Sequence, residues 1–272
     1  MTHPIEITEA DDSRVDVFRD VRDRDVRGRH GMFIAESEMV VRRLFKHPVQ
    51  LHSVLLSPTK YERMHHECDA LPEDIPVYVA PLAMMESIAG FHIHRGVLAA
   101  GWRPNEQDLS CERLFERLEG VERACLLAVS GVTNVDNIGG LFRTAAGLGI
   151  RELILDGDCA DPLYRKAIRV SMGHVLGLPW TVSQDLSSTL NHLGDLGYSI
   201  VAAESCHGAV PLETISPADK LVIVVGSEGH GLSAGILDQA DVVGEIPMQP
   251  EVPSLNVVVA AGIMMAHLCR TV

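Results

Sequence analysis

Short apolar segments alternate with helical segments through the second half of the chain, and this alternation limits the fold most. The expected strands are rich in Val, Ile and Leu and cover residues 124–129, 152–155, 180–183, 199–203, 221–225 and 242–246. Helical spacing is expected over residues 138–148, 162–170, 186–196, 232–239 and 255–270. Strands that are buried on both faces form continuous apolar runs, because helices cover both sides of a parallel sheet. The pattern therefore predicts an α/β domain with a mostly parallel sheet.

The first half of the chain has the same alternation on a smaller scale. Strand-like segments cover 51–56, 75–80 and 95–100, and helical spacing covers 38–45, 58–68 and 81–88. Strands that alternate with short helices are typical of a small α/β unit. We expect a first domain at residues 1–100, a linker with a charged helix at 101–123, and a second domain at 124–272.

Composition excludes several classes of protein. The chain has 272 residues, of which 46% are hydrophobic and 22% charged, as in an ordinary globular protein. Its net charge of −14 argues against a protein that coats nucleic acid through overall basic charge, although a local basic patch is compatible with it. The N-terminus lacks the apolar stretch of a signal peptide, and the apolar run at 257–265 is too short to span a bilayer. We expect a cytoplasmic protein without membrane contact.

Cysteine and histidine patterns give no sign of a metal site. The six cysteines are scattered and form no CxxC pair, which favours free thiols in a reducing cytoplasm over a disulfide framework or a zinc site. His92 and His94 share one face of a strand, but no third ligand has a matching spacing, so no metal is expected.

A row of arginines alternates with aspartates near the N-terminus. The arginines are Arg14, Arg19, Arg22, Arg24, Arg27 and Arg29. Such a run is usually the solvated face of a helix. An arginine row that faces RNA is the alternative, although the interleaved acids would weaken its attraction for phosphate.

A polar stretch at residues 134–146 follows the first strand of the second domain. Its Asn and Gly residues suit a tight turn, and from Ile138 it is expected to become a helix that Gly149 closes. Ligands of open α/β sheets bind at loops of this kind. Arg143 is expected near the start of that helix, where the helix dipole disfavours a cation. Either a salt bridge or a functional role explains its position.

Two further loops follow strands later in the chain. The loop at 226–233 carries glycines spaced Gly-x-x-Gly-x-Gly. The dinucleotide fingerprint has the reverse spacing, Gly-x-Gly-x-x-Gly, and follows the first strand of its fold, whereas this loop stands near the C-terminus. The pattern therefore argues against a Rossmann-type nucleotide enzyme. Glu228 stands between its glycines, where a phosphate-binding loop seldom has a carboxylate. The loop at 246–256 is stiffened by three prolines. Ser254 is the expected N-cap of the last helix, with Asn256 in its first turn.

Together the three loops resemble the three signature motifs of the SpoU/TrmH family of RNA 2′-O-ribose methyltransferases, in the SPOUT superfamily. The matching residues are Asn137, Gly139, Arg143, Thr144 and Ala145, then Gly226, Ser227, Glu228, Gly229, Gly231 and Leu232, and finally Ile246, Pro247, Met248, Ser254, Leu255 and Asn256. Their order and spacing also fit. Two features depart from the family pattern: Ser37 stands where a glycine is common, and Gln249-Pro250-Glu251 replaces a more glycine-rich stretch.

The resemblance implies a fold, a cofactor and a substrate. The fold is a SPOUT-type parallel sheet with a deep trefoil knot, preceded by a small L30e-like α/β domain that binds RNA. The cofactor is S-adenosylmethionine, the active site forms across a homodimer interface, and the methyl acceptor is a ribose 2′-OH in structured RNA. An N-terminal domain of this size favours rRNA over tRNA by association with other members. A non-catalytic RNA-binding or assembly protein with the same fold is the alternative.

The resemblance also assigns residues. Gly226, Ile246 and Leu255 would contact the cofactor through their backbone, with Met248 nearby. Arg143, whose pKa is too high for a base, would hold the adjacent phosphate and stabilise the forming alkoxide. The remaining catalytic candidates would orient the ribose, Arg143 or the loops: Asn137, Glu228, Ser254 and Asn256.

Overall fold

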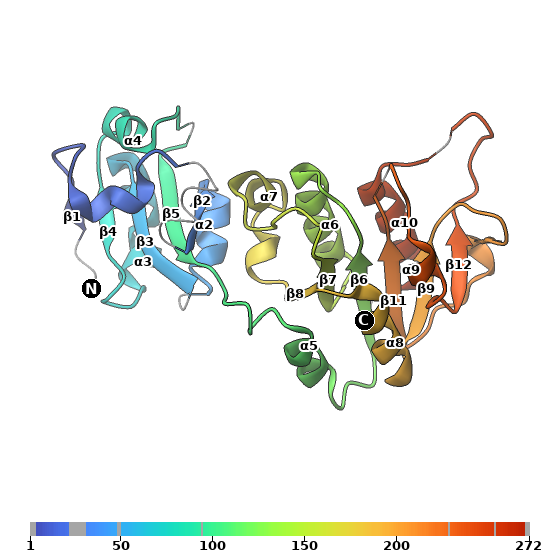
Figure 1. Ribbon diagram of the computed structural model, residues 1–272. Helices are drawn as coiled ribbons and strands as arrows, with labels where there is room; N and C mark the ends of the chain where they lie inside the picture. Colours follow the sequence, from blue (N-terminus) through green and yellow to red (C-terminus); the bar gives the residue numbers. More distant parts are fainter. Residues whose placement is uncertain are drawn as a thin grey trace. The chain divides into compact units, whose positions relative to one another are not determined.

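The computed structural model describes residues 4–21, 31–47, 50–93, 95–227, 229–252 and 254–269. The chain divides into two compact units, coloured from blue to red along the sequence in Figure 1. The first unit comprises Met1–Pro104 together with Leu163–Gly177, and the second comprises Asn105–Pro162 and Leu178–Val272. The described part of the chain contains no helix that is both long and apolar enough to cross a membrane.

The first unit is built on a mixed sheet of five strands in the order β1-β4-β3-β5-β2. β1, β4 and β3 are parallel, whereas β5 runs antiparallel to both β3 and β2. The strands are β1 (Ile5–Glu6), β2 (Met32–Glu36), β3 (Leu51–Leu56), β4 (Val77–Val79) and β5 (Val97–Trp102). The helices are α2 (Glu38–Leu44), α3 (Pro58–Asp69), α4 (Leu82–Ala89) and α7 (Arg165–Val170), with 3₁₀ turns η1 (Ser13–Phe18) and η3 (His174–Leu176).

The arginine row predicted near the N-terminus is only partly described. Arg14 bonds to Asp12, and Arg19 lies 3.0 Å from Asp16, so both guanidinium groups are paired with neighbouring carboxylates. The segment between them is the short turn η1, which buries Val15, Val17 and Phe18 in the core. Arg22, Arg24, Arg27 and Arg29 lie outside the described residues, as does His94.

The second unit holds a parallel sheet of seven strands in the order β10-β12-β9-β11-β6-β7-β8. Its strands are β6 (Ala124–Val129), β7 (Glu152–Asp156), β8 (Trp180–Ser183), β9 (Ser199–Ala203), β10 (Val210–Pro211), β11 (Lys220–Val225) and β12 (Val242–Glu245). Its helices are α5 (Cys111–Leu118), α6 (Val135–Gly147), α8 (Leu186–Asp195), α9 (Ala234–Leu237) and α10 (Val257–Leu268), with the 3₁₀ turn η4 (Leu212–Thr214). The predicted parallel α/β sheet is confirmed.

Helices cover both faces of the seven-stranded sheet, as the apolar strands require. On one face, α5, α8 and α9 pack against alternate residues of the central strands, including Leu126, Ile200 and Val222. On the other, α6 lies against α10, and α10 packs against β11 and β9. Both faces are therefore dry, which explains why these strands carry apolar residues at consecutive positions.

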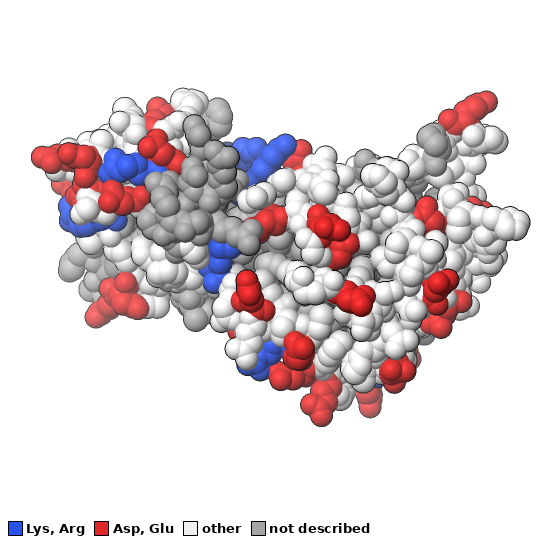
Figure 2. All heavy atoms as spheres, in the orientation of Figure 1, with Lys and Arg blue, Asp and Glu red and all other residues white. Residues whose placement is uncertain are grey.

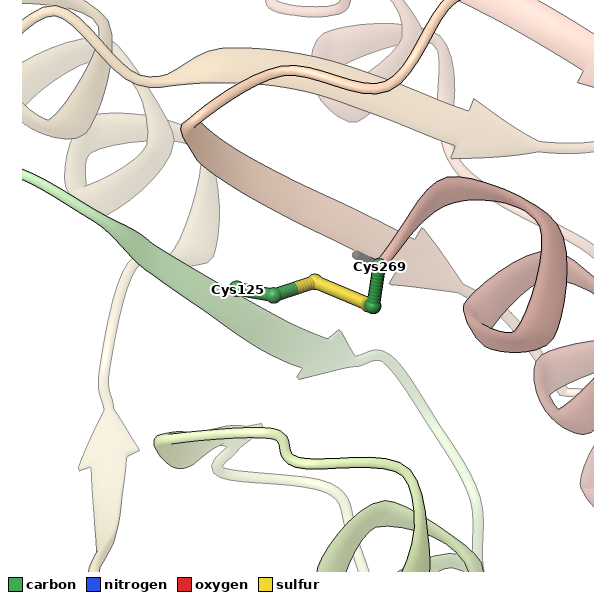
Figure 3. Close-up of a disulfide and its surroundings, with 2 residues drawn as sticks. All are labelled: Cys125 and Cys269. Atoms are coloured by element: carbon green, nitrogen blue, oxygen red, sulfur yellow. A yellow bond between two sulfur atoms is a disulfide. The ribbon is translucent and has the colours of Figure 1, made fainter. Parts of the chain in front are cut away.

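The expectation of free thiols throughout is wrong for two cysteines. Figure 3 shows Cys125, from β6, joined through its sulfur to Cys269, just beyond the end of α10. Their Cα atoms lie 6.1 Å apart although 144 positions separate them in sequence, a separation within the usual range for disulfides. Cys68, Cys111, Cys159 and Cys206 are free. No sequence spacing marks this pair, because only the packing of α10 against α6, β11 and β9 brings the two cysteines together.

Candidate active site

The three motif-bearing loops meet at one edge of the seven-stranded sheet. They follow β6, β11 and β12, and because all strands are parallel, their carboxyl ends share that edge. β6 pairs with β7 on one side and β11 on the other, so the connections leave in opposite directions between β6 and β11. Open parallel sheets bind ligands at such a switch point.

The loop after β6 is clamped by a carboxylate at the end of the neighbouring strand. Asp156 accepts hydrogen bonds from Ser130 Oγ at 2.7 Å and from the backbone N–H of Gly131 at 2.8 Å. Asn134 then caps α6 by accepting from the backbone N–H of Asp136 at 2.8 Å. The loop thus fixes where α6 begins and, with it, the positions of Asn137 and Arg143.

The sequence pattern indicates Arg143 near the start of a helix, but in the structure this residue lies further along. α6 begins at Val135, three residues earlier than expected, so Arg143 stands in its third turn with an exposed side chain. The helix dipole does not disfavour a cation at this position, because it does so only near the N-terminus. The helix ends at Gly147, and the predicted Gly149 follows its C-cap with a φ of +77°, where the N–H of Ile150 bonds to the carbonyl of Ala145 at 3.0 Å.

α6 and α10 approach closely through small residues. A Cβ atom on Gly140 would lie 2.8 Å from a methyl of Val258, so only glycine permits this spacing. At the beginning of α10, Asn256 donates from Nδ2 to Oδ1 of Asn137 at 3.0 Å. The structure therefore brings together two predicted catalytic residues that are 119 positions apart in sequence.

Asn256, not Ser254, caps the last helix. Its Oδ1 accepts from the backbone N–H of Val258 at 3.0 Å, and α10 begins one residue after Asn256. Ser254 is exposed and makes no cap, which corrects both expectations for this turn. Glu228, another predicted catalytic residue, lies outside the described residues.

A cavity of about 370 Å³ opens between the loops that follow β9, β11 and β12. All four predicted cofactor residues line it: Gly226, Ile246, Met248 and Leu255. Its wall also includes Ser254, Val257 and Ala260, and the carboxylates of Glu204 and Glu245, but among its described lining residues there is no Lys or Arg. An apolar, glycine-lined cavity with acidic groups suits a planar ring joined to a cationic group.

The candidate catalytic residues do not all share this cavity. Ser254 lines it, whereas Asn137, Arg143 and Asn256 are absent from the described residues of its wall. The site within one chain thus has two parts, the cavity and the α6–α10 surface. Leu255 lines the cavity, whereas Asn256, the next residue in sequence, belongs to the α6–α10 surface.

Two carboxylates near the site, Asp156 and Glu204, are not among the residues predicted from the sequence. Asp156 orders the loop after β6, and Glu204 accepts a hydrogen bond from the backbone N–H of Leu232 at 2.8 Å. Both stand at the carboxyl end of a parallel strand, β7 and β9 respectively. Position at a strand end was the available signal, because ligand-site residues of α/β sheets gather there.

Comparisons with known proteins identify the family of the chain. The model of the SpoU rRNA Methylase family matches residues 124–266. An uncharacterized tRNA/rRNA methyltransferase of Mycobacterium tuberculosis (strain ATCC 25618 / H37Rv) is 34% identical over 98% of this chain and 92% of its own length. The 23S rRNA (guanosine-2′-O-)-methyltransferase RlmB of Acinetobacter baylyi is 33% identical over 74% of this chain and 81% of its own.

A solved structure shows the same fold over nearly the whole chain. The S-adenosylmethionine-bound rRNA methyltransferase from Sinorhizobium meliloti superposes with a TM-score of 0.78 at 21% identity, covering 97% of this chain and 96% of that one. With a family model that matches more than half of its residues, the chain belongs to the SpoU rRNA methylase family, and it is an RNA methyltransferase that uses S-adenosylmethionine.

Proposed function

We propose that the protein transfers a methyl group from S-adenosylmethionine to a ribose 2′-OH in structured RNA, with rRNA favoured over tRNA. The observation that carries this proposal is the contact between Asn137 and Asn256, which unites the loops after β6 and β12 beside the cavity. The relative named as a 23S rRNA (guanosine-2′-O-)-methyltransferase supports the choice of acceptor.

The cavity fits the cofactor. Gly226 has no room for a side chain, since a Cβ there would lie 2.6 Å from the backbone carbonyl carbon of Gly231, so the glycine lets the loop that lines the cavity fold tightly on itself. Ile246, Met248 and Leu255 supply apolar walls, and Glu245 supplies negative charge. When bound, S-adenosylmethionine provides an electrophilic methyl group on a positively charged sulfur.

Arg143 is proposed to act on the RNA. Its exposed guanidinium would hold the phosphate beside the acceptor ribose and stabilise negative charge on the 2′-oxygen as that oxygen loses its proton. Asn137, Ser254, Asn256 and Glu228 would orient the ribose or the loops. The proton passes to phosphate or water, because an arginine with a pKa above about 12 cannot accept it.

A homodimer is proposed to complete the site. Val259 and Ile263, four positions apart on α10, are 50% and 38% exposed and form an apolar surface beside Asn256. A second copy of the chain would cover this surface and bring its own Arg143 to the cavity. We also propose the deep trefoil knot that the resemblance implies.

RNA would be held by local basic patches rather than by overall charge. Figure 2 shows acidic side chains scattered over the visible face of the second unit. In the first unit, the exposed Arg95 and Arg169 line one cavity of about 410 Å³, and Lys166 is exposed on the same helix as Arg169. We propose that this surface of the first unit binds RNA phosphates. We also propose that the protein acts in the cytoplasm.

Labelled methyl transfer tests the proposed function. The full-length protein is incubated with S-adenosylmethionine carrying a labelled methyl group and with rRNA or tRNA, and the modified position is mapped by its resistance to alkaline cleavage, which requires a free 2′-OH. Arg143→Ala should lose at least about 100-fold in turnover while cofactor binding persists. Arg123→Ala, which removes an exposed arginine paired with Asp219 at 3.2 Å, is the matched control and should keep its activity. RNA binding without methyl transfer by the wild type would support the non-catalytic alternative instead.

A further inference from the structure

We infer that Glu204 is a positioning residue for the cofactor, acting by holding the glycine loop after β11 in its binding shape. This inference rests on the proposed cofactor cavity. Glu204 belongs to none of the three motifs, and it follows directly after β9, the strand that lies between β11 and β12.

Glu204 connects two of the walls of the cavity. Its backbone N–H bonds to the carbonyl of Gly244, in β12, at 3.2 Å. Its carboxylate Oε2 accepts from the backbone N–H of Leu232, at the end of the glycine loop, at 2.8 Å. The residue therefore fixes the loop after β11 to the strand from which the third loop departs.

The glycine loop is built around this carboxylate. The loop closes on itself through a bond of 3.0 Å from the N–H of Gly231 to the carbonyl of Ser227. Gly231 has a φ of +64°, and a Cβ on it would lie 3.0 Å from the carboxyl carbon of Glu204. Both the backbone conformation and the space taken by Glu204 thus require glycine at this position.

The hydrogen bond from the N–H of Leu232 to Glu204 restricts the conformation of the cavity wall. The side chain of Leu232 is 7% exposed and sits in the core with α9, so its N–H bond to Glu204 fixes the remaining freedom of the loop end. Gly226, Gly229 and Gly231 lie upstream of this anchor and line the cavity. Without the bond, these glycines, which have the greatest conformational freedom of any residue, would not stay in one arrangement.

Two substitutions separate positioning from direct charge recognition. Glu204→Ala removes the acceptor, whereas Glu204→Gln keeps a carbonyl oxygen that can accept from Leu232 and removes only the charge. Loss of a hydrogen bond to a charged group predicts that Glu204→Ala weakens S-adenosylmethionine binding about 10- to 100-fold. Glu204→Gln should stay within about threefold of the wild type, because an amide oxygen replaces the carboxylate oxygen at the same position.

Calorimetric titration of the full-length protein with S-adenosylmethionine, together with steady-state kinetics, makes the measurement. The expected result is a raised Kd and KM in Glu204→Ala with kcat at saturating cofactor changed much less, and rescue in Glu204→Gln. Glu213→Ala, an exposed glutamate outside the cavity, is the matched control and should bind as the wild type does. Unaltered binding by Glu204→Ala would overturn the inference, and so would equally weak binding by the alanine and glutamine variants.

Should Glu204→Ala fail to fold, Gly231→Ala gives a second test. Its added methyl group presses on the Glu204 carboxylate. If the two residues are coupled, its loss of cofactor affinity should be smaller in the Glu204→Asp background, because the shorter side chain leaves room for the methyl group. Strictly additive effects of the two substitutions would overturn the inference. If the wild type itself fails to bind S-adenosylmethionine, the proposed cofactor site fails, a result distinct from the failure of Glu204 as its anchor.

Discussion

Asn256, at the start of α10, both caps the helix and contacts Asn137, and substitution can separate these two roles. Asn256 caps the helix through Oδ1 and contacts Asn137 through Nδ2. Asn256→Ala should lower the free energy of unfolding by about 1 kcal/mol through loss of the cap, whereas Asn256→Ser keeps a good cap residue and should lose little stability. Both variants lose the bond to Asn137, so both should lose activity about 3- to 10-fold. Urea unfolding and methyl-transfer rates measure the two effects, and a serine variant with wild-type turnover would contradict the proposed role of the Asn137 contact.

A second residue-scale prediction concerns alkaline pH. Burial raises the pKa of the Cys159 thiol to about 12, with the nearby Asp156 adding to the shift. In the unfolded chain a thiol loses its proton near pH ~8.5, so between these values the unfolded state binds fewer protons than the folded state. The stabilising contribution of this thiol is therefore fully present below the unfolded pKa and is lost as pH rises toward 12.

Urea unfolding across alkaline pH measures this contribution. Between pH ~9 and ~10.5, Cys159→Ala should remove a decline of up to about 1.4 kcal/mol per pH unit in the free energy of unfolding. Cys206→Ala, which changes an exposed cysteine, should leave the wild-type decline in place. Equal pH slopes for Cys159→Ala and the wild type would contradict the role assigned to burial.

At the residue scale, the motifs were sufficient to select four residues that line one cavity, and insufficient to predict contacts between distant segments. Gly226, Ile246, Met248 and Leu255 stand in loops that follow strands, and all four line one cavity. The contact of Asn137 with Asn256 and the pairing of Cys125 with Cys269 join positions more than 100 residues apart. No periodicity in the sequence encodes such pairs, because they depend on how the elements pack.

At the scale of elements, α5 is attached to the sheet by a buried ion pair. Arg117 donates from Nε to Glu152 of β7 at 3.0 Å and from Nη2 to Thr181 of β8 at 2.9 Å. The Glu152 side chain is only 2% exposed, against 33% for Arg117. Arg117→Met would leave a carboxylate buried without its cation, and we expect it to lower the free energy of unfolding by about 3 kcal/mol.

The same helix offers the control for this prediction. Arg113 pairs with Glu116 at 2.6 Å, but both side chains are about half exposed, so Arg113→Met should cost less than about 1 kcal/mol. Combining Arg117→Met with Glu152→Gln removes the buried charge and should recover part of the loss. Chemical unfolding of the three variants measures these differences. Equal stability of Arg117→Met and Arg113→Met would show that burial of Glu152 does not set the strength of this attachment.

Elements whose patterns are strong were predicted almost to the residue, and the failures have packing causes. β6, β8 and β9 have the predicted bounds. In β6 the continuous apolar run marks a buried parallel strand. The start of α6 was placed three residues late, because Asn137, Gly139 and Gly140 are typical of a turn. In the folded chain Gly140 is instead the point of closest approach to Val258 of α10. Tertiary packing thus overrides the weak helix propensity of glycine.

At the scale of the whole molecule, the two parts of the site raise the question of which chain supplies each part. The cavity after β9, β11 and β12 and the exposed Arg143 of α6 belong to the same protomer, yet Arg143 is absent from the described lining of that cavity. The exposed Val259 and Ile263 on α10 give a surface through which a second copy could approach. A homodimer in which each chain's Arg143 serves the other's cavity would reconcile these positions.

Mixing two inactive variants tests this arrangement. Arg143→Ala keeps an intact cavity, whereas Gly226→Ala keeps Arg143 but places a Cβ 2.6 Å from the backbone of Gly231 in the cavity wall. Each variant alone should be inactive. In a heterodimer, the cavity of the first variant meets Arg143 of the second, so one of the two sites is complete. Equal mixing with free exchange of subunits should restore about a quarter of wild-type methyl transfer, since half of the dimers are mixed and each has one working site. A mixture that stays inactive while light scattering shows mixed dimers would place Arg143 and its cavity in the same chain.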